Sequence, residues 1–286
     1  MRLATATARK HLQAPVRYRT EEIVTTQAPR AFNRQMYDHQ PANVFYGTDD
    51  GYQDGSFTEF QEIKAHFESV APHRKEDIHM ISVVGGLYGL NLIPLWRPKR
   101  ITIFDINPTA LTYFRIIRHV FTTSRDVPHF LARLTDGDYA AETDEERFVR
   151  ENIRLKQKGN LPRSRGSSKR PYEQSWQYAF ENFDLTKRIL SEVPLEIRSE
   201  PMESYSFRGS IRRQNNLWIY SSNITEFHYF DLEFADPSNV VLLQIIYPGE
   251  APQILDLASL SGGPVKVKFE IPLKAERLEN VSEARP

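Results

Sequence analysis

The chain carries over residues 78–108 the stretch Ile78-His-Met-Ile-Ser-Val-Val-Gly-Gly-Leu-Tyr-Gly-Leu-Asn-Leu-Ile-Pro-Leu-Trp-Arg-Pro-Lys-Arg-Ile-Thr-Ile-Phe-Asp-Ile-Asn-Pro108, which decides the fold class. An apolar, β-rich run over 78–84 ends in a glycine turn, and a short predicted helix follows. A second apolar run ends on Asp105. Glycines let the backbone approach a ligand, and an acidic side chain after the second strand accepts hydrogen bonds from both ribose hydroxyls. The stretch therefore predicts the first βαβ half of a nucleoside-binding sheet.

The glycine turn is Gly85-Gly86-Leu87-Tyr88-Gly89, and it does not fit the Gly-x-Gly-x-x-Gly fingerprint of dinucleotide-binding proteins. A nicotinamide cofactor needs a tight turn at a helix N-terminus to hold its pyrophosphate. This turn is looser and matches the Gly-x-x-x-Gly turn of enzymes that use S-adenosylmethionine, which has no pyrophosphate. Asp105 follows Gly85 by 20 residues, as expected for the ribose-binding acid. The alternative for Asp105 is a helix N-cap, but Asn107 before Pro108 is available for that role.

Length and composition limit the classes of protein to which the chain can belong. With 286 residues, of which 40% are hydrophobic, the chain is long enough for one large domain or for one domain with a cap. Lys plus Arg and Asp plus Glu both number 37, so net charge gives no general attraction to nucleic acid. The absence of cysteine excludes disulfides and thiolate nucleophiles. The first residues lack a secretory signal, and no run is long enough to span a bilayer, so we expect a cytoplasmic protein.

Helical periodicity divides the chain. Residues 1–30 are polar and irregular, and residues 31–55 are rich in aromatic side chains. The apolar spacing predicts a helix over 56–70. We expect these three segments to form an N-terminal arm and cap, 1–70. The remainder, 71–286, is the expected cofactor-binding domain. Further helices are predicted over 109–121, 129–154 and 175–190. The region of about 110–190 is therefore an expected helical insertion between the second and third strands of the sheet.

Strand patterns return after the helical region. They cover 195–198, 216–221 and 240–247, followed by 252–257 and 265–271. The last two flank Ser261-Gly-Gly-Pro264, so we expect them to pair antiparallel with each other. Residues 153–170 contain seven basic residues and no acidic one. They lack interleaved aromatic residues, so a solvated loop is favoured over a segment that binds RNA phosphates.

Five predicted parallel strands followed by a hairpin resemble the class I S-adenosylmethionine-dependent transferases, which have a Rossmann-like α/β fold. Within that class, three motifs resemble the 3-amino-3-carboxypropyltransferases related to betaine-lipid synthase, and isonocardicin synthase performs the same type of transfer. These motifs are Ser82-Val-Val-Gly-Gly-Leu-Tyr-Gly, Asp105-Ile-Asn-Pro108 and Tyr220-Ser-Ser-Asn-Ile-Thr-Glu226. The resemblance covers about residues 78–250. It implies transfer of the 3-amino-3-carboxypropyl group to a small-molecule or lipid acceptor, release of methylthioadenosine, and no metal.

The resemblance also implies roles for particular residues. Binding of S-adenosylmethionine is assigned to Gly85, Gly86, Leu87, Gly89, Asp105, Ile106, Asn107, Glu203, Ser222 and Asn223. Ser222 and Asn223 would face the sulfonium and the acceptor, although a helix cap is an equal alternative. Glu203 would accept a hydrogen bond from the adenine amine, or else lie in a surface turn.

The remaining candidates concern the acceptor. His228 follows Asn223 by five residues and is a candidate base, which makes Asn223 and His228 the expected catalytic residues. Tyr37 and Tyr46 would close over the substrate, or anchor their loop to the core. Two other functions stay open. One is a small-molecule methyltransferase. The other is a non-catalytic nucleoside-binding or RNA-associated protein, because Ser82 and Val83 stand where such methyltransferases usually carry an acidic residue in the first strand.

Overall fold

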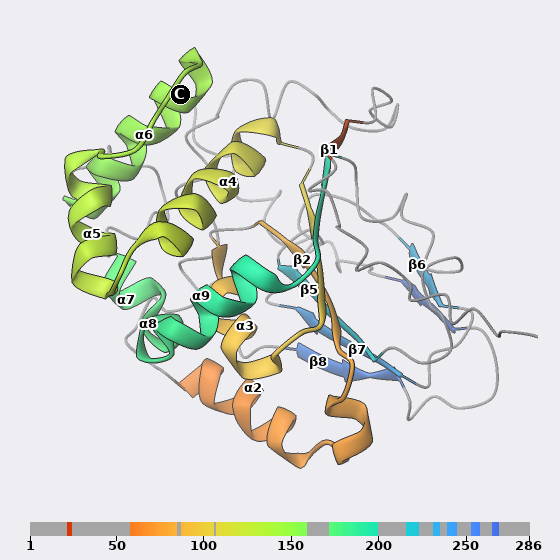
Figure 1. The fold of residues 1–286 in the computed structure, drawn as a ribbon. Helices are drawn as coiled ribbons and strands as arrows, with labels where there is room; N and C mark the ends of the chain where they lie inside the picture. Colours follow the sequence, from red (N-terminus) through yellow and green to blue (C-terminus); the bar gives the residue numbers. More distant parts are fainter. Residues whose placement is uncertain are drawn as a thin grey trace, which may run out of the picture.

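The computed structural model of the chain describes residues 22–24, 58–84, 87–105, 107–158, 172–199, 216–222, 231–234, 239–244, 253–257 and 265–268. The strands in these parts are β1 (Glu22–Val24), β2 (His79–Val83), β3 (Arg100–Phe104), β4 (Leu195–Ser199), β5 (Leu217–Ser222), β6 (Asp231–Phe234), β7 (Val240–Gln244), β8 (Gln253–Asp256) and β9 (Val265–Lys268). The helices are α2 (Thr58–Ser69), the 3₁₀ helix η3 (Pro72–Lys75), α3 (Gly89–Trp96), α4 (Pro108–Thr123), α5 (Val127–Asp136), α6 (Asp144–Gln157), α7 (Tyr172–Ser175), α8 (Gln177–Glu181) and α9 (Phe183–Glu192), as Figure 1 shows.

A single mostly parallel sheet organises the fold. Among the described residues it has seven strands in the order β1-β4-β3-β2-β5-β7-β8, and only β8 runs antiparallel to its neighbour. The chain passes from the central strand β2 outward through β3 to β4, and then to β5 and β7 on the other side of β2. This architecture confirms the α/β prediction and is compatible with a Rossmann-like fold.

The centre of the sheet is buried on both faces. All five residues of β2 are buried, and so are four of the five in β3, which is typical of parallel strands covered by other layers. Two polar side chains in this region satisfy each other, since the His79 Nε2 and Thr102 Oγ1 atoms lie 2.8 Å apart. Burial lowers the pKa of His79 to about 3, so the imidazole is neutral and serves the core rather than proton transfer.

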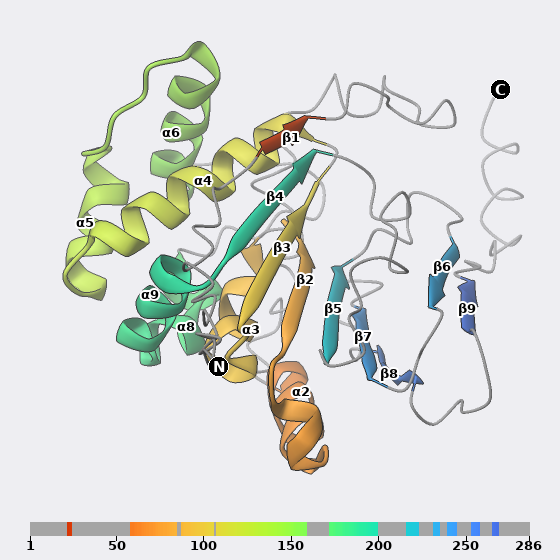
Figure 2. The ribbon, with the colours of Figure 1, turned by 45° about the vertical axis from the view of Figure 1, so that its right-hand side comes forward.

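The helices that follow β2 in the chain, α3 to α9, lie together beside the sheet. Figures 1 and 2 show α3, α4, α8 and α9 close to the sheet and α5 and α6 on the outside of α4. In Figure 2, α2 lies at the amino end of β2. Every residue of α3 is buried, which follows from its apolar sequence and its place between sheet and helices. None of the described helices is both long and apolar enough to cross a membrane.

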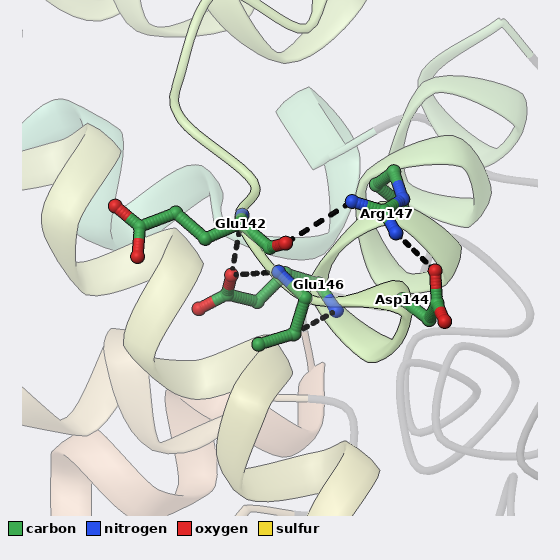
Figure 3. Close-up of polar contacts among 5 residues, drawn as sticks. Glu142, Asp144, Glu146 and Arg147 are labelled. Carbon is green, nitrogen blue, oxygen red and sulfur yellow. Dashed lines mark hydrogen bonds and ion pairs between the residues drawn. The ribbon is translucent and has the colours of Figure 1, made fainter.

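The predicted helix over 129–154 is two helices, because strong end signals interrupt it. Helix α5 ends where Gly137 takes a left-handed conformation, with φ 69°, and donates its N–H to Arg133 O. Helix α6 begins with a capping box between Thr143 and Glu146, which Figure 3 shows beside the ion pair of Arg147 with Asp144. Hydrogen bonds from the backbone N–H groups of Thr143 and Glu142 lower the pKa of Glu146.

The pairing expected at the C-terminal end of the described chain is wrong. Strand β8 pairs antiparallel with β7, and β9 pairs antiparallel with β6 in a separate two-stranded sheet. The expectation rested on Ser261-Gly-Gly-Pro264 as a local turn signal. A turn signal does not decide between partners, and the apolar β7, which is buried from Val240 to Leu243, offers β8 a larger surface than a hairpin would.

The polar N-terminal arm contributes to the sheet. Glu22–Val24 form β1, which pairs in parallel with Ile197–Ser199 at the edge of the sheet. Composition alone predicted no element here, because three residues carry no readable strand period. The proposed division between a cap over 1–70 and a domain over 71–286 stays a prediction.

Candidate functional site

Five of the predicted site residues are described, and they lie at or just after the carboxyl ends of β2, β3 and β5: Leu87, Gly89, Asp105, Asn107 and Ser222. Val83 at the end of β2 pairs with Phe104 at the end of β3, and Ser82 pairs with Tyr220 of β5. The chain leaves β2 in one direction for β3 and returns on its other side as β5. Such a point of reversal at the carboxyl edge of an open α/β sheet is where these folds bind ligands. The topology therefore places these five described positions at the same end of the sheet.

The structure describes the glycine turn from Leu87 onward. Leu87 donates its N–H to Val84 O over 2.7 Å. Leu87 also has φ 62°, a left-handed conformation that is uncommon for a residue with a branched side chain. Its side chain is buried, so surrounding packing holds the strained backbone in place. Gly85 and Gly86, the first residues of the turn, lie outside the described residues.

Gly89 allows the first turn of α3 to lie directly against β2. A Cβ atom at this position would lie 2.8 Å from Ser82 Oγ and 3.3 Å from Met80 Cε. Ser82 is buried, and its hydroxyl donates to Val83 O. Close packing between helix and strand is the role of the third glycine in nucleotide-binding turns. Whether Gly89 and Leu87 also contact a cofactor stays a prediction.

Asp105 and Asn107 divide two tasks after β3. Asn107 is the N-cap of α4, since its Oδ1 accepts the Thr109 N–H over 3.0 Å. Asp105 does not cap the helix. Its Oδ1 accepts the Asn107 N–H over 2.9 Å, and its own N–H donates to Arg198 O. Asp105 is half-buried. The bond to β4 and the short turn to Asn107 thereby place its carboxylate at the carboxyl end of β3. Ile106, between them, lies outside the described residues.

The end of β5 lies on the other side of the glycine turn. Ser221 is buried, with its Oγ 3.4 Å from Leu243 O, and Ser222 is the last residue of the strand. The register between β5 and β7 shifts between Tyr220 and Ser222. The ring of Tyr220 packs on that of Tyr88, with centroids 5.3 Å apart. This aromatic pair links the glycine turn to β5, and the sequence pattern had not singled it out.

Several predicted residues cannot be placed. Outside the described residues lie Tyr37, Tyr46, Glu203, Asn223 and His228. Their roles in binding and catalysis stay predictions. Among the described residues, no group of three or more His, Asp or Glu side chains is arranged to hold a metal ion.

A buried lysine lies among tyrosines in the helical region, and sequence reasoning had assigned it to a charged, solvated segment. Lys156 is 1% exposed, and its amine lies 5.2 Å from the centre of the Tyr172 ring. Tyr113 donates its hydroxyl hydrogen to the Tyr172 hydroxyl over 3.0 Å. Burial lowers the pKa of Lys156 to about 7 and raises that of Tyr113 well above its ordinary value. The signal in the sequence was the position of Lys156, three residues after Ile153 and seven after Val149 on the buried face of α6.

Comparison with known proteins adds no family to this geometry: no protein-family model matches the chain, and no match was found among curated proteins.

Proposed function

We propose that the chain is an S-adenosylmethionine-dependent transferase of the class I fold. In this proposal, α4–α9 form a helical insertion between β3 and β4, which are the second and third strands of the core. The observation that carries the proposal is the position of Asp105. Its carboxylate stands at the carboxyl end of β3, beside the β2 strand that leads into the glycine turn. An acidic side chain at this point of a Rossmann-like sheet binds a ribose.

The sequence of the turn favours a ligand without a pyrophosphate. Gly85-Gly86-Leu87-Tyr88-Gly89 lacks the Gly-x-Gly-x-x-Gly fingerprint with which dinucleotide-binding proteins hold a pyrophosphate at a helix N-terminus. This favours a nucleoside held by its ribose over a dinucleotide. In the proposed site, Asp105 binds the ribose, while the turn from Gly85 to Gly89 lies along the amino acid part of the substrate.

The proposed reaction is a displacement at carbon. A lone pair of the acceptor forms a bond to the γ-carbon of the 3-amino-3-carboxypropyl group. The bond between that carbon and sulfur breaks, its electron pair stays on sulfur, and neutral methylthioadenosine leaves. The acceptor gives its proton to a base, for which His228 is the proposed residue. Such a reaction depends mainly on alignment and on exclusion of water, and Ser222 and Asn223 are proposed to align the moving group.

The test is product analysis with the full-length chain. We would incubate it with S-adenosylmethionine labelled with ¹³C in the carboxypropyl carbons, together with small amines, carboxylates, phenols or vesicles that contain diacylglycerol. We expect methylthioadenosine and a labelled acceptor by mass spectrometry. S-adenosylhomocysteine as the nucleoside product would assign a methyltransferase instead. Tight binding of S-adenosylmethionine with neither product would assign a non-catalytic nucleoside-binding protein, and binding of NAD without any response to S-adenosylmethionine would overturn the proposal.

A further inference from the structure

A buried amide joins the glycine turn to the helical region. Asn91 lies in the first turn of α3, two residues after Gly89, and is fully buried. Its Nδ2 donates to Ser175 O over 2.9 Å, and its Oδ1 accepts the Ala179 N–H over 3.1 Å. Both partners are backbone atoms more than 80 residues further along the chain, so the contact is one between elements and not a local turn.

The two partners are the groups that a broken helix leaves without intrahelical bonds. Helix α7 ends at Ser175 and α8 begins at Gln177, with Trp176 between them. The last carbonyls of a helix and the first N–H groups of the next one have no partners in their own helices. Trp176, the N-cap of α8, makes no capping bond with its side chain. Asn91 satisfies one carbonyl of α7 and one N–H of α8 at the same time, and thus caps both from a third helix.

The same residue stands close to the strained part of the proposed site. The Asn91 N–H donates to Tyr88 O, and Tyr88 follows Leu87, whose backbone is left-handed. A strained turn persists only where its surroundings hold it. Two contacts hold the first turn of α3, which follows Leu87. Gly89 packs closely against Ser82 of β2, and the Asn91 side chain bonds to α7 and α8.

We propose that Asn91 is a positioning residue of the proposed cofactor site, which keeps the glycine turn in its binding conformation by tying α3 to the break between α7 and α8. The inference rests on the proposed function for the identity of the ligand, S-adenosylmethionine. It goes beyond that function because it makes affinity at the turn depend on a helical region that is far away in the sequence.

A matched control is available in α9. The hydroxyl of Thr186 is buried and donates to Ala179 O, 3.3 Å away, and to Asn182 O. Thr186→Val removes a bond to the same residue of α8 but leaves the two bonds of the Asn91 side chain in place. We expect both Asn91→Leu and Thr186→Val to weaken α8, and only Asn91→Leu to remove its bonds to α3.

The first measurement needs no ligand. We would follow hydrogen exchange of the Leu87 N–H, which is bonded to Val84 O, by NMR in the full-length chain. We expect exchange to be faster by about tenfold or more in Asn91→Leu, the effect of losing about 1.4 kcal/mol of local stability, and near the wild-type rate in Thr186→Val. Equal rates in the two variants would overturn the proposal.

The second measurement is calorimetric titration with S-adenosylmethionine. We expect Asn91→Leu to weaken binding by about tenfold, and Thr186→Val to change it less than about twofold. If Asn91→Leu does not fold, Asn91→Asp serves, because its carboxyl group donates to Ser175 O only when protonated. Affinity of that variant should then be lower than that of the wild type at neutral pH, and an equal affinity would overturn the role of Asn91. A wild-type chain that does not bind S-adenosylmethionine refutes the proposed function, while the exchange rates still decide the role of Asn91.

Discussion

Replacing Lys156 by methionine should make the protein more stable at neutral pH. The amine of Lys156 is buried between α6 and α7, and its burial lowers its pKa from 10.5 to about 7. Methionine has a similar length and keeps the contacts of the lysine stem, but carries no charge to desolvate. Between pH 7 and pH 10.5 the unfolded chain binds a proton at this position that the folded chain does not. Stability of the wild-type protein therefore rises with pH across this window.

The size of the effect follows from the shift in pKa. One pKa unit corresponds to about 1.4 kcal/mol. A lysine that titrates at 10.5 when unfolded and at about 7 when folded destabilises the fold by about 4 kcal/mol at pH 7 and by about 2 kcal/mol at pH 9. Lys156→Met should recover up to these amounts, less the contacts that the neutral amine makes in the fold.

The assay is urea denaturation of the wild-type protein, Lys156→Met and Lys158→Met at pH 7 and pH 9. Lys158 is exposed and lies in the same segment, so its substitution controls for the general effect of removing a positive charge. We expect the stability difference between Lys156→Met and the wild type to shrink by about 2 kcal/mol from pH 7 to pH 9, and that of Lys158→Met to stay constant. A difference independent of pH would refute the argument that Lys156 is charged in the unfolded chain and neutral in the fold.

Further predictions concern the glycine turn, Asp105, Asn223 and the basic segment. Gly89→Ala should cost about 1–3 kcal/mol in urea denaturation, because of the contact with Ser82 Oγ, and should cost much less in a Ser82→Ala background; additive costs would contradict the clash. Asp105→Ala and Asp105→Asn should both weaken S-adenosylmethionine binding by about 2–3 kcal/mol in calorimetry. Only Asp105→Ala should also lower the stability of the fold, because it removes the acceptor for the Asn107 N–H. Unchanged affinity in both variants would mean that Asp105 only stabilises the turn. Asn223→Ala should lower kcat more than it lowers affinity for S-adenosylmethionine, and the reverse would make it a binding residue only. Replacing 160–169 by a short Gly-Ser linker should change the unfolding free energy by less than about 1 kcal/mol, because the Tyr172 N–H already bonds to Gln157 Oε1; a large loss would show that the segment contributes to the fold.

Most strands and helices were predictable because their patterns are local, whereas the short strands β1 and β6 were not predicted. β2 and β3 are continuous apolar runs, as expected for central parallel strands, and both lie within one or two residues of the predicted ranges. The N-cap of α4 was readable as well, since Asn followed by Pro specifies how a helix begins. In each case the residues that determine the structure lie next to it in the sequence.

Strand partners and helix breaks were not predictable in the same way. The pairing of β8 with β7 depends on which apolar edge the chain meets after folding, and the turn at Ser261–Pro264 carries no information about it. The sequence pattern predicts one helix over 175–190, but the structure has a break at Trp176. At this break, the Ser175 carbonyl and the Ala179 N–H bond to the side-chain amide of Asn91 on α3. Partners of this kind are far away in the sequence, and a local pattern does not contain them.

The candidate site depends more on topology than on the family resemblance. The connection from β2 through α3 places β3 on one side of β2, and the chain continues outward to β4 before β5 returns to the other side. Polar groups at the carboxyl ends of the neighbouring parallel strands β2, β3 and β5 then lie at the same end of the sheet, whichever family the chain belongs to. Asp105 at this edge argues for a nucleoside on its own. The resemblance to aminocarboxypropyltransferases is needed only to choose which carbon beside the sulfonium is attacked, so a different nucleoside product would revise the reaction and leave the binding site in place.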